Sequence, residues 1–334
     1  MYKLHNRRYI GNKFKLIGFI LDVLKKEKVV FNSCADLFAG TGVVSEYFLS
    51  QNKHVFINDA LYSNYVFYNA WLSNGKYNEI KINDLLAYYN SSKDYIFDNY
   101  FSDNFSGTYF SYDNAKKIGS IRQHLESIKS KLTKREFFIV LASLLYSIDQ
   151  IANTVGHYES FLSSNPTEKP LVLKMLDITR YANTPIITCE DANKLAKDIE
   201  VDLIYIDPPY NSRQYINFYH ILENLALWQK PQVFGKTLKM DRTGKKSQYS
   251  KANAVNVLKQ LLCNVKTKYI LLSYNNTYAA KSIASINKIK TEDIYDILYS
   301  LGSVKKYEAN YRFFNSGKTH LEKHKEFLFL GKLK

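Results

Sequence analysis

Residues 33–59 read SCADLFAGTGVVSEYFLSQNKHVFIND, and this stretch decides the fold. The apolar run SCADLF predicts a strand over 33–38, and AGTG predicts a tight turn after it. VVSEYFLSQN then predicts a helix, and HVFIND predicts a second strand that ends in Asp59. A strand, a glycine-containing turn, a helix and a second strand make the first unit of a doubly wound α/β fold.

The flanking sequence extends this alternation. Apolar residues at helical spacing predict helices over 14–28 and 60–72. After residue 184, TPIITCED predicts a strand, ANKLAKDI a helix, and VDLIYID a strand that runs into DPPY. A helix around FYHILENLALW and a strand KYILLSYNN follow, and YEANYR with KEFLFLGKL predicts a closing hairpin. We therefore expect an α/β core with a mixed, mostly parallel sheet and a C-terminal antiparallel hairpin.

The middle of the chain differs from the rest. From about residue 90 to 184 the alternation stops, and residues 100–114 form an aromatic, polar stretch that we interpret as a loop. Helical patterns follow over 115–132 and 135–155. We expect residues 1–90 and 185–334 to form one domain, and 91–184 to be a helical insertion in it.

Composition limits the partners and the location of the chain. The formal net charge of +15 fits a polyanionic partner, although a lysine-rich solvated surface explains it as well. No apolar run reaches the length of a membrane span, and the N-terminus lacks a signal region, so we expect a cytoplasmic protein without a membrane partner. Three scattered cysteines and the spacing HLEKH at His320 and His324 give no metal-site pattern, so we expect no metal.

The first constellation with chemical meaning is DLFAGTG, residues 36–42. Glycines between a strand and a helix let the backbone turn tightly and approach a ligand closely. Asp59 lies 19 residues after Gly40, where a carboxylate can accept hydrogen bonds from ribose hydroxyls. A tight turn without a ligand is the alternative. The run GTGVVS lacks the third glycine of a dinucleotide site, which counts against a nicotinamide-linked oxidoreductase.

The second constellation is Asp207, Pro208, Pro209 and Tyr210, directly after the strand VDLIYI. Two prolines stiffen the turn, so the Asp207 side chain and the Pro208 carbonyl present acceptors in fixed positions. Tyr210 adds a flat aromatic face, and the three groups together suit a planar amino group such as adenine N6. A rigid turn without a ligand is the alternative, but open α/β sheets bind ligands at the carboxyl ends of their strands.

These two motifs, with RRYIGNK at residues 7–13, resemble the D12 class (alpha-group, Dam-like) of adenine-N6 DNA methyltransferases in type and in order along the chain. The resemblance implies a Rossmann-like S-adenosylmethionine methyltransferase core, S-adenosylmethionine as cofactor and a target-recognition role for the insertion. It also implies that the partner is double-stranded DNA and that the protein belongs to a restriction-modification system. A cognate restriction endonuclease encoded separately is then a possible partner.

The resemblance assigns roles to individual residues. The implied catalytic residues are Asp207, Pro208, Pro209 and Tyr210. The implied cofactor-binding residues are Tyr9, Lys13, Asp36, Phe38, Gly40, Gly42, Asp59, Asp191 and Asp207. Dam-like enzymes usually carry Trp where Tyr9 stands and Gly where Asn12 stands, so the N-terminal contacts depart from the family pattern.

The expected mechanism is base flipping followed by direct in-line transfer of the methyl group to N6. Basic and aromatic residues of the insertion and of the loop over 235–252 are the candidates for DNA contact, with a solvated mobile loop as the alternative. They are Arg122, His157, Tyr158, Lys239, Arg242, Lys245 and Lys246. Two further functions stay open, an rRNA adenine-N6 methyltransferase and a non-catalytic nucleic-acid-binding protein.

Overall fold

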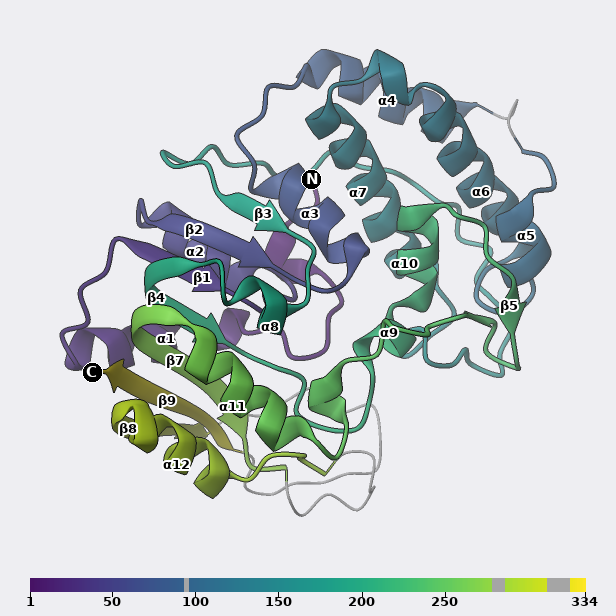
Figure 1. Ribbon diagram of the computed structural model, residues 1–334. Helices are drawn as coiled ribbons and strands as arrows, with labels where there is room; N and C mark the ends of the chain where they lie inside the picture. Colours follow the sequence, from purple (N-terminus) through teal and green to yellow (C-terminus); the bar gives the residue numbers. More distant parts are fainter. Residues whose placement is uncertain (93–95, 278–285, 311–324) are drawn as a thin grey trace. The chain divides into compact units, whose positions relative to one another are not determined.

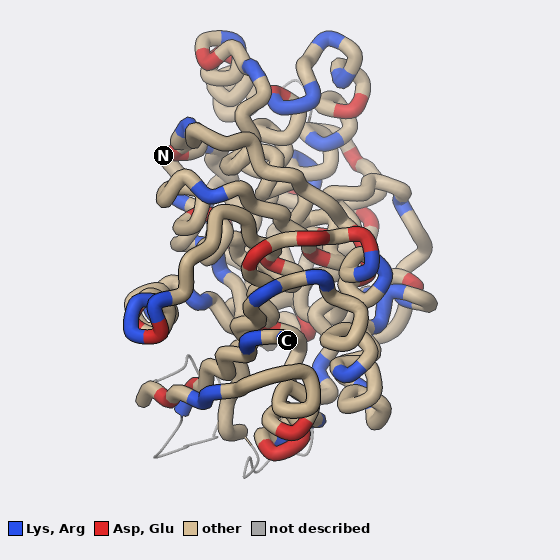
Figure 2. The backbone as a smooth tube through the Cα atoms, turned by 60° about the vertical axis from the view of Figure 1, so that its left-hand side comes forward, with Lys and Arg blue, Asp and Glu red and all other residues tan. Residues whose placement is uncertain are grey.

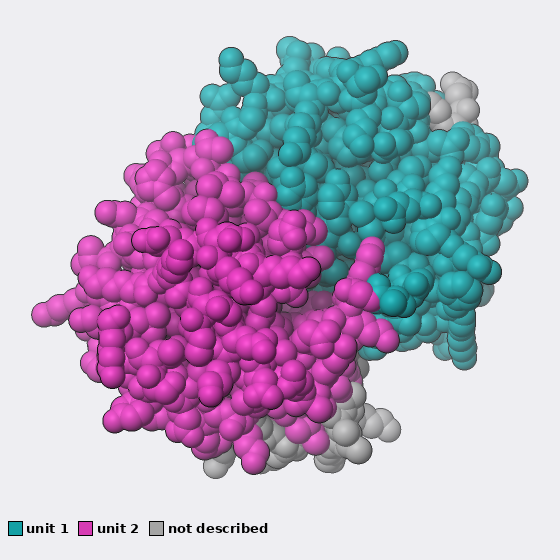
Figure 3. Space-filling view, viewed as in Figure 1, with its two compact units in different colours: residues 1–9, 61–180, 216–243 teal, residues 10–60, 181–215, 244–334 magenta. Residues whose placement is uncertain are grey.

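The computed structural model describes residues 1–92, 96–277, 286–310 and 325–334. Two compact units share the chain (Figure 3). Unit 1 consists of residues 1–9, 61–180 and 216–243, and unit 2 of residues 10–60, 181–215 and 244–334. The sequence predicted a catalytic domain of residues 1–90 and 185–334 and a target-recognition insertion at 91–184. This division and the role of the insertion stay predictions.

Unit 2 is built on a seven-stranded sheet in the order β3-β2-β1-β4-β7-β9-β8 (Figure 1). β1, β2, β3, β4 and β7 pair in parallel, and β9 pairs antiparallel with both β7 and β8. The mostly parallel sheet and the C-terminal antiparallel hairpin are confirmed. The strands are β1 (Ser33–Asp36), β2 (His54–Asn58), β3 (Ile186–Thr188), β4 (Glu200–Ile206), β7 (Lys266–Asn275), β8 (Gly302–Asn310) and β9 (Lys325–Leu333).

Helices cover both faces of this sheet. Figure 1 shows α8, α11 and α12 on the near face, and α1 and α2 behind it. Apolar residues of the near-face helices, such as Leu258 and Leu298, form one core with sheet residues such as Ile204 and Leu272. The helices are η2 (Phe14–Leu16), α1 (Ile17–Lys26), α2 (Val43–Ser50), α8 (Ala192–Leu195), η4 (Gln248–Ser250), α11 (Ala254–Asn264) and α12 (Thr291–Leu301).

The strand order reverses beside β1. The chain adds β2 and then β3 on one side of β1, and it returns to place β4 on the other side, where Asp36 pairs with Tyr205. In open α/β sheets, ligands bind in the crevice at such a reversal, outside the carboxyl ends of the strands. A ligand site is therefore expected at the loops that follow β1 and β4.

Unit 1 is helical, apart from a short ladder of β5 (Val233–Phe234) with β6 (Lys239–Met240). α7 is buried along almost its whole length, and α3, α4, α6 and α10 pack on it. The helices are η1 (Leu4–Asn6), α3 (Tyr62–Trp71), α4 (Glu79–Ser91), α5 (Tyr100–Phe105), α6 (Tyr112–Ser127), η3 (Lys129–Lys131), α7 (Lys134–Ile151) and α10 (His220–Leu227). α9 (Tyr215–Phe218) lies where the chain passes from unit 2 to unit 1. Among the residues described above, no helix is both long and apolar enough to cross a membrane.

The prediction of a loop over residues 100–114 is wrong for much of that stretch, because α5 and the start of α6 lie in it. Asn99 caps α5, because its side chain accepts from the N–H groups of Phe101 and Ser102. In return the Ser102 hydroxyl accepts from the N–H of Asn99 over 2.9 Å, which completes a capping box. Phe101, Phe105, Tyr109 and Phe110 are fully buried and form core, whereas Tyr112 is exposed.

Candidate active site

The loop after β1 turns on two glycines. Gly40 and Gly42 have φ values of 54° and 85°, a region that residues with a Cβ rarely adopt. The N–H of Gly42 donates to the carbonyl of Ala39 over 2.7 Å, and α2 begins at Val43. Residues 39–42 carry only small side chains, so a ligand can approach this backbone closely.

Asp59 stands directly after β2 and faces this loop. Its Oδ2 accepts a hydrogen bond from the N–H of Gly40 over 2.9 Å. The neighbouring Asn58 donates through Nδ2 to the carbonyl of Leu37 over 3.1 Å, which ties the ends of the two strands together. The structure thus brings together the glycine loop and the acid that the sequence predicted beside it.

Asp36, the last residue of β1, lies beneath the loop. It is 1% exposed, and its Oδ2 accepts from the Ser45 hydroxyl of α2 over 2.8 Å. Burial raises the pKa of the Asp36 carboxyl to about 7 against the hydrogen bond from Ser45, and the charges of Asp207 and Asp59 add to the rise. Asp36 therefore supports the start of α2 from inside the unit.

Asp207 follows β4 at the same edge of the sheet, next to the glycine loop. Its Oδ1 lies 3.2 Å from Nζ of Lys13 and accepts a hydrogen bond from the Tyr210 hydroxyl. Within the described residues, Oδ2 of Asp207 makes no hydrogen bond or ion pair. Burial raises the pKa of Asp207, while the Lys13 ammonium and these hydrogen bonds oppose the rise. One carboxylate oxygen is held by the protein, and the other is available to a ligand.

The ring of Tyr210 is held from several sides. Its hydroxyl accepts from Nζ of Lys13 over 3.0 Å, and its ring centroid lies 4.5 Å from that of Tyr274. The N–H of Lys288 donates to the Tyr210 carbonyl over 2.7 Å, and the Tyr274 hydroxyl donates to it over 3.3 Å. Tyr210 nevertheless stays partly exposed, as an aromatic face beside a ligand must.

Lys13 has a second acidic neighbour, Glu326 of β9. The Lys13 ammonium lies 3.6 Å from Oε2 of Glu326, and both side chains are 6% exposed. The Lys13 side chain, expected at the methionine part of a cofactor, is thus engaged by Asp207, Tyr210 and Glu326.

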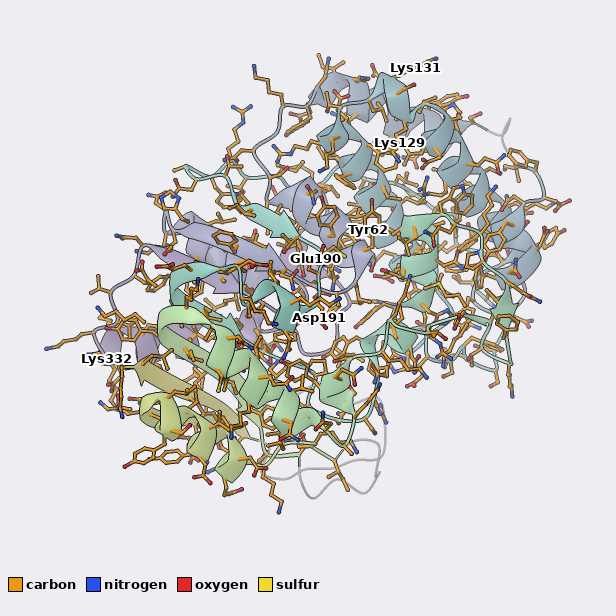
Figure 4. The ribbon with its side chains drawn as sticks, in the orientation of Figure 1. Tyr62, Lys129, Lys131, Glu190, Asp191 and Lys332 are labelled. Carbon is orange, nitrogen blue, oxygen red and sulfur yellow. The ribbon has the colours of Figure 1, made fainter. Side chains whose placement is uncertain are left out.

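Two further predicted residues flank the loop. Asp191 is exposed at the start of α8 and caps it by accepting from the N–H groups of Asn193 and Lys194 (Figure 4). The ring of Phe38 meets that of Tyr249 edge to face, with centroids 5.1 Å apart. The Tyr249 hydroxyl donates to Asn193 over 2.7 Å, which links the start of α8 to the Phe38 side of the loop.

Tyr9 belongs to unit 1. Its ring stacks on that of Tyr219, with centroids 4.6 Å apart and 5° between the planes. Its hydroxyl accepts from Nδ2 of Asn64 over 3.2 Å. A cofactor contact by Tyr9 stays a prediction.

Two residues predicted to contact DNA are buried inside unit 1. Arg122 is 2% exposed, and its guanidinium donates to the Leu225 carbonyl over 2.8 Å and pairs with Glu126. Tyr158 is 1% exposed, and its hydroxyl donates to Asp149 over 2.6 Å. A phosphate cannot reach these groups in this structure, because other parts of unit 1 already cover and bind them.

The other DNA candidates are more accessible. Lys245 and Lys246 are exposed, while His157, Lys239 and Arg242 are partly exposed. The Arg242 guanidinium donates to the side chain of Asn217. Figure 2 shows Lys and Arg positions distributed along the chain among Asp and Glu positions. Contact of these residues with DNA stays a prediction.

Metal-ligating side chains do not cluster in the part of the chain that the structure describes. No group of three or more His, Cys, Asp or Glu side chains within the described ranges is placed to hold a metal ion. His320 and His324 lie outside the described residues.

Sequence reasoning missed Glu326, Tyr249 and Tyr274. Glu326 stands in the apolar strand sequence KEFLFLGKL, and an acid in such a strand is a signal for a buried charge. Tyr249 lies in the stretch interpreted as a basic loop, and Tyr274 in a buried strand. Nothing near either residue marks it as a neighbour of the site.

Known proteins resemble this chain over most of its length. The sequence profile described as D12 class N6 adenine-specific DNA methyltransferase matches residues 9–310. The chain is 34% identical over 345 residues to the modification methylase StsI of Streptococcus sanguinis. This match covers 87% of this chain and 51% of that protein. It is 31% identical over 329 residues to the type II methyltransferase M.NlaIII of Neisseria lactamica, which covers 95% of each.

The lengths of these relatives differ. The chain spans about half the length of StsI and of the modification methylase LlaI of Lactococcus lactis, and nearly all of M.NlaIII. Among solved structures, magnesium protoporphyrin IX methyltransferase of Synechocystis PCC 6803 is similar at a TM-score of 0.37 and 9% identity, over 95% of this chain and 82% of that one. That likeness is too distant to bear on function.

Proposed function

Because the chain belongs to the D12 class of N6 adenine-specific DNA methyltransferases, we propose that it transfers a methyl group from S-adenosylmethionine to adenine N6 in double-stranded DNA. The proposal includes modification of a specific site, as part of a restriction-modification system. A cognate restriction endonuclease encoded separately is a proposed partner.

The observation that carries the proposal is that two loops lie next to each other. The glycine loop follows β1, the Asp207 turn follows β4, and these strands pair at the reversal of the sheet. A cofactor bound at the first loop and an adenine bound at the second would lie side by side. Direct transfer between two bound molecules requires this proximity.

The residues around the first loop fit S-adenosylmethionine. Gly40 and Gly42 leave the backbone open to close approach, and Asp59 offers carboxylate oxygens to ribose hydroxyls. Phe38 and the exposed Asp191 would line the adenine part. When bound, the cofactor supplies an electrophilic methyl group on its sulfonium.

The Asp207 turn supplies what the amino group needs. N6 is a weak nucleophile because its lone pair is delocalised into the ring. Oδ2 of Asp207, together with the Pro208 carbonyl, would accept its two hydrogens and favour a tetrahedral nitrogen with its lone pair free. Tyr210 is partly exposed, and its ring would stack on the flipped base and offset part of the cost of extruding it.

The direct test is transfer of a labelled methyl group by the purified chain. Plasmid DNA and ribosomal RNA are offered separately with tritiated S-adenosylmethionine, and the modified adenines are located by long-read sequencing. We expect label in DNA at one short sequence. Label in RNA alone would replace DNA as the substrate, and label in neither would remove the proposed activity.

Asp207→Ala provides the matched variant. It should lose transfer because the nitrogen loses its carboxylate acceptor, while the fold survives. Glu200→Ala, at the exposed far end of the same strand, should keep wild-type transfer. Near-normal transfer by Asp207→Ala would take Asp207 out of the mechanism.

A further inference from the structure

The Lys13 ammonium lies between two carboxylates that come from different strands. Oδ1 of Asp207, at the end of β4, is 3.2 Å from Nζ, and Oε2 of Glu326, in β9, is 3.6 Å from it. The side chains of Lys13 and Glu326 are each 6% exposed, and that of Asp207 is 15% exposed. All three residues belong to unit 2.

Stability alone does not account for Glu326. Burying an acid is costly, and a buried ion pair can often be replaced as a whole by apolar residues at no loss of stability. Oε2 of Glu326 is buried without a hydrogen-bond partner among the described residues, so its principal contact is the charge of Lys13. The next residues along the strand, Phe327 to Leu330, are buried and apolar, so an apolar side chain would suit this place.

The contacts of Lys13 fall on one oxygen of Asp207. Nζ of Lys13 and the Tyr210 hydroxyl both engage Oδ1, which leaves Oδ2 without a partner in the described part of the chain. Fixing one oxygen of a carboxylate fixes the direction of the other. The orientation of Oδ2 therefore depends on where the Lys13 ammonium is held.

We propose that Glu326 is a positioning residue that anchors the Lys13 ammonium and thereby aims Oδ2 of Asp207 at the N6 group. The proposal rests on the proposed function, because it gives a role to Glu326 in that reaction. In this proposal Glu326 acts through Lys13 and makes no contact of its own with substrate or cofactor. The effect passes through the Lys13 ammonium, which contacts Oδ1 of Asp207 and donates to the Tyr210 hydroxyl.

The anchor depends on the charge of Glu326. Burial raises the pKa of Glu326 to about 7, Lys13 opposes the rise and Asp207 adds to it. Below that pH Glu326 becomes neutral and holds the ammonium less firmly. The charged or titratable groups that act on Asp207 or Glu326 are Lys13, Asp36, Tyr205 and Tyr210, and Asn275 is hydrogen-bonded to Glu326.

The first test separates positioning from stability. Glu326→Leu should lower kcat by about 10- to 100-fold, because a small misplacement of a reacting group has that effect. The cofactor Kd should stay within about twofold, and any fall in Tm should be small, because Asp207 still compensates the charge of Lys13. Glu326→Gln keeps an acceptor for Lys13 and should recover part of kcat. Glu308→Gln, on the exposed face of β8, is the control and should change nothing.

Two further readouts complete the test. The wild-type kcat should rise with pH around 7 as Glu326 ionises, and that rise should be absent from Glu326→Gln. Independently of activity, the ¹³C carboxyl signal of Asp207 should show an inflection near the Glu326 pKa, which Glu326→Gln abolishes. The signal is assigned with Asp207→Asn.

Three results would overturn the role of Glu326. The first is a normal kcat in Glu326→Leu. The second is a loss of kcat that a lower Tm explains. The third is an Asp207 carboxyl signal whose pH titration is the same in wild type and in Glu326→Gln. If Glu326→Leu does not fold, Glu326→Gln and the carboxyl titration decide. A wild-type chain that methylates no nucleic acid would instead remove the proposed function, while the titration would still report whether Glu326 acts on Asp207.

Discussion

The N–H of Gly40 donates to Oδ2 of Asp59 over 2.9 Å, so one acid ties the end of the second strand to the glycine loop after the first. Asp59 therefore has two separable tasks. It holds the backbone of the loop, and in the proposed function it also receives the ribose hydroxyls of the cofactor.

Asp59→Asn should separate these tasks. The amide oxygen can still accept from Gly40, but the charge that strengthens hydrogen bonds to ribose is lost. We expect the affinity for S-adenosylmethionine to fall by about 1.5–3 kcal/mol, with little change in Tm. Isothermal titration calorimetry measures the affinity, with the exposed Asp198→Asn as control. An unchanged affinity would mean that Asp59 holds the backbone of the loop and does not bind the ribose.

Tyr210 should act mainly through its ring. Tyr210→Phe keeps the ring and removes one of the two groups that hold Oδ1 of Asp207, so we expect a loss in transfer rate of less than about tenfold. Tyr210→Ala also removes stacking worth about 1–3 kcal/mol and should lose far more. Single-turnover rates on the same DNA compare the two variants. Equal losses would show that the hydroxyl, and not the ring, is what matters.

Asp36 should make stability depend on pH. Its folded pKa is about 7, whereas an unfolded Asp titrates near 4, so between these pH values the folded chain binds the extra proton. The free energy of unfolding should therefore fall as pH rises through this range. Asp36→Asn lacks this loss, so its Tm advantage over wild type should grow between about pH 5 and about pH 8. Thermal denaturation at both pH values measures it, and a constant difference would contradict the argument.

Arg122 should matter for stability. Arg122→Met leaves the Leu225 carbonyl without its buried donor and breaks the pair with Glu126. We expect a loss of roughly 2–4 kcal/mol in the free energy of unfolding, measured by urea denaturation. DNA affinity of the folded variant should be unchanged. A stable variant with weakened DNA binding would reverse this assignment.

Lys245 and Lys246 should show the opposite pattern, because both are exposed. Replacing both with Ala should leave the Tm unchanged and weaken DNA binding. The slope of log affinity against log salt should decrease by about one for each phosphate that the protein no longer neutralises. Fluorescence anisotropy over a salt series gives the slope. An unchanged slope would mean that neither lysine meets a phosphate.

The core of unit 2 could be predicted from the sequence because each local signal agreed with the next. The apolar run before Gly40, the acid at Asp59 and the strand before Asp207 fit one β-α-β plan, and the structure brings these residues to one edge of the sheet. Periodicity and turn residues are local properties, so a single sequence is enough to reveal them.

Features that depend on distant partners could not be predicted. Arg122 and Tyr158 have residue types that usually face water, but the Leu225 carbonyl and Asp149 satisfy them inside unit 1. Glu326 meets Lys13 only because β9 enters the sheet beside β7, an order that no periodicity encodes. The short helix α5 was missed because it depends on one capping box, Asn99 with Ser102.

The position of β9 has a consequence for the synthesis of the protein. This strand lies between β7 and β8, although both precede it in the chain, and it carries Glu326. While the ribosome is still adding residues up to 324, β7 and β8 have no shared partner, and Lys13 lacks one of its two acids. A nascent chain therefore cannot complete the surroundings of Lys13 until β9 has been made, and a product truncated before β9 would lack the contact with Glu326.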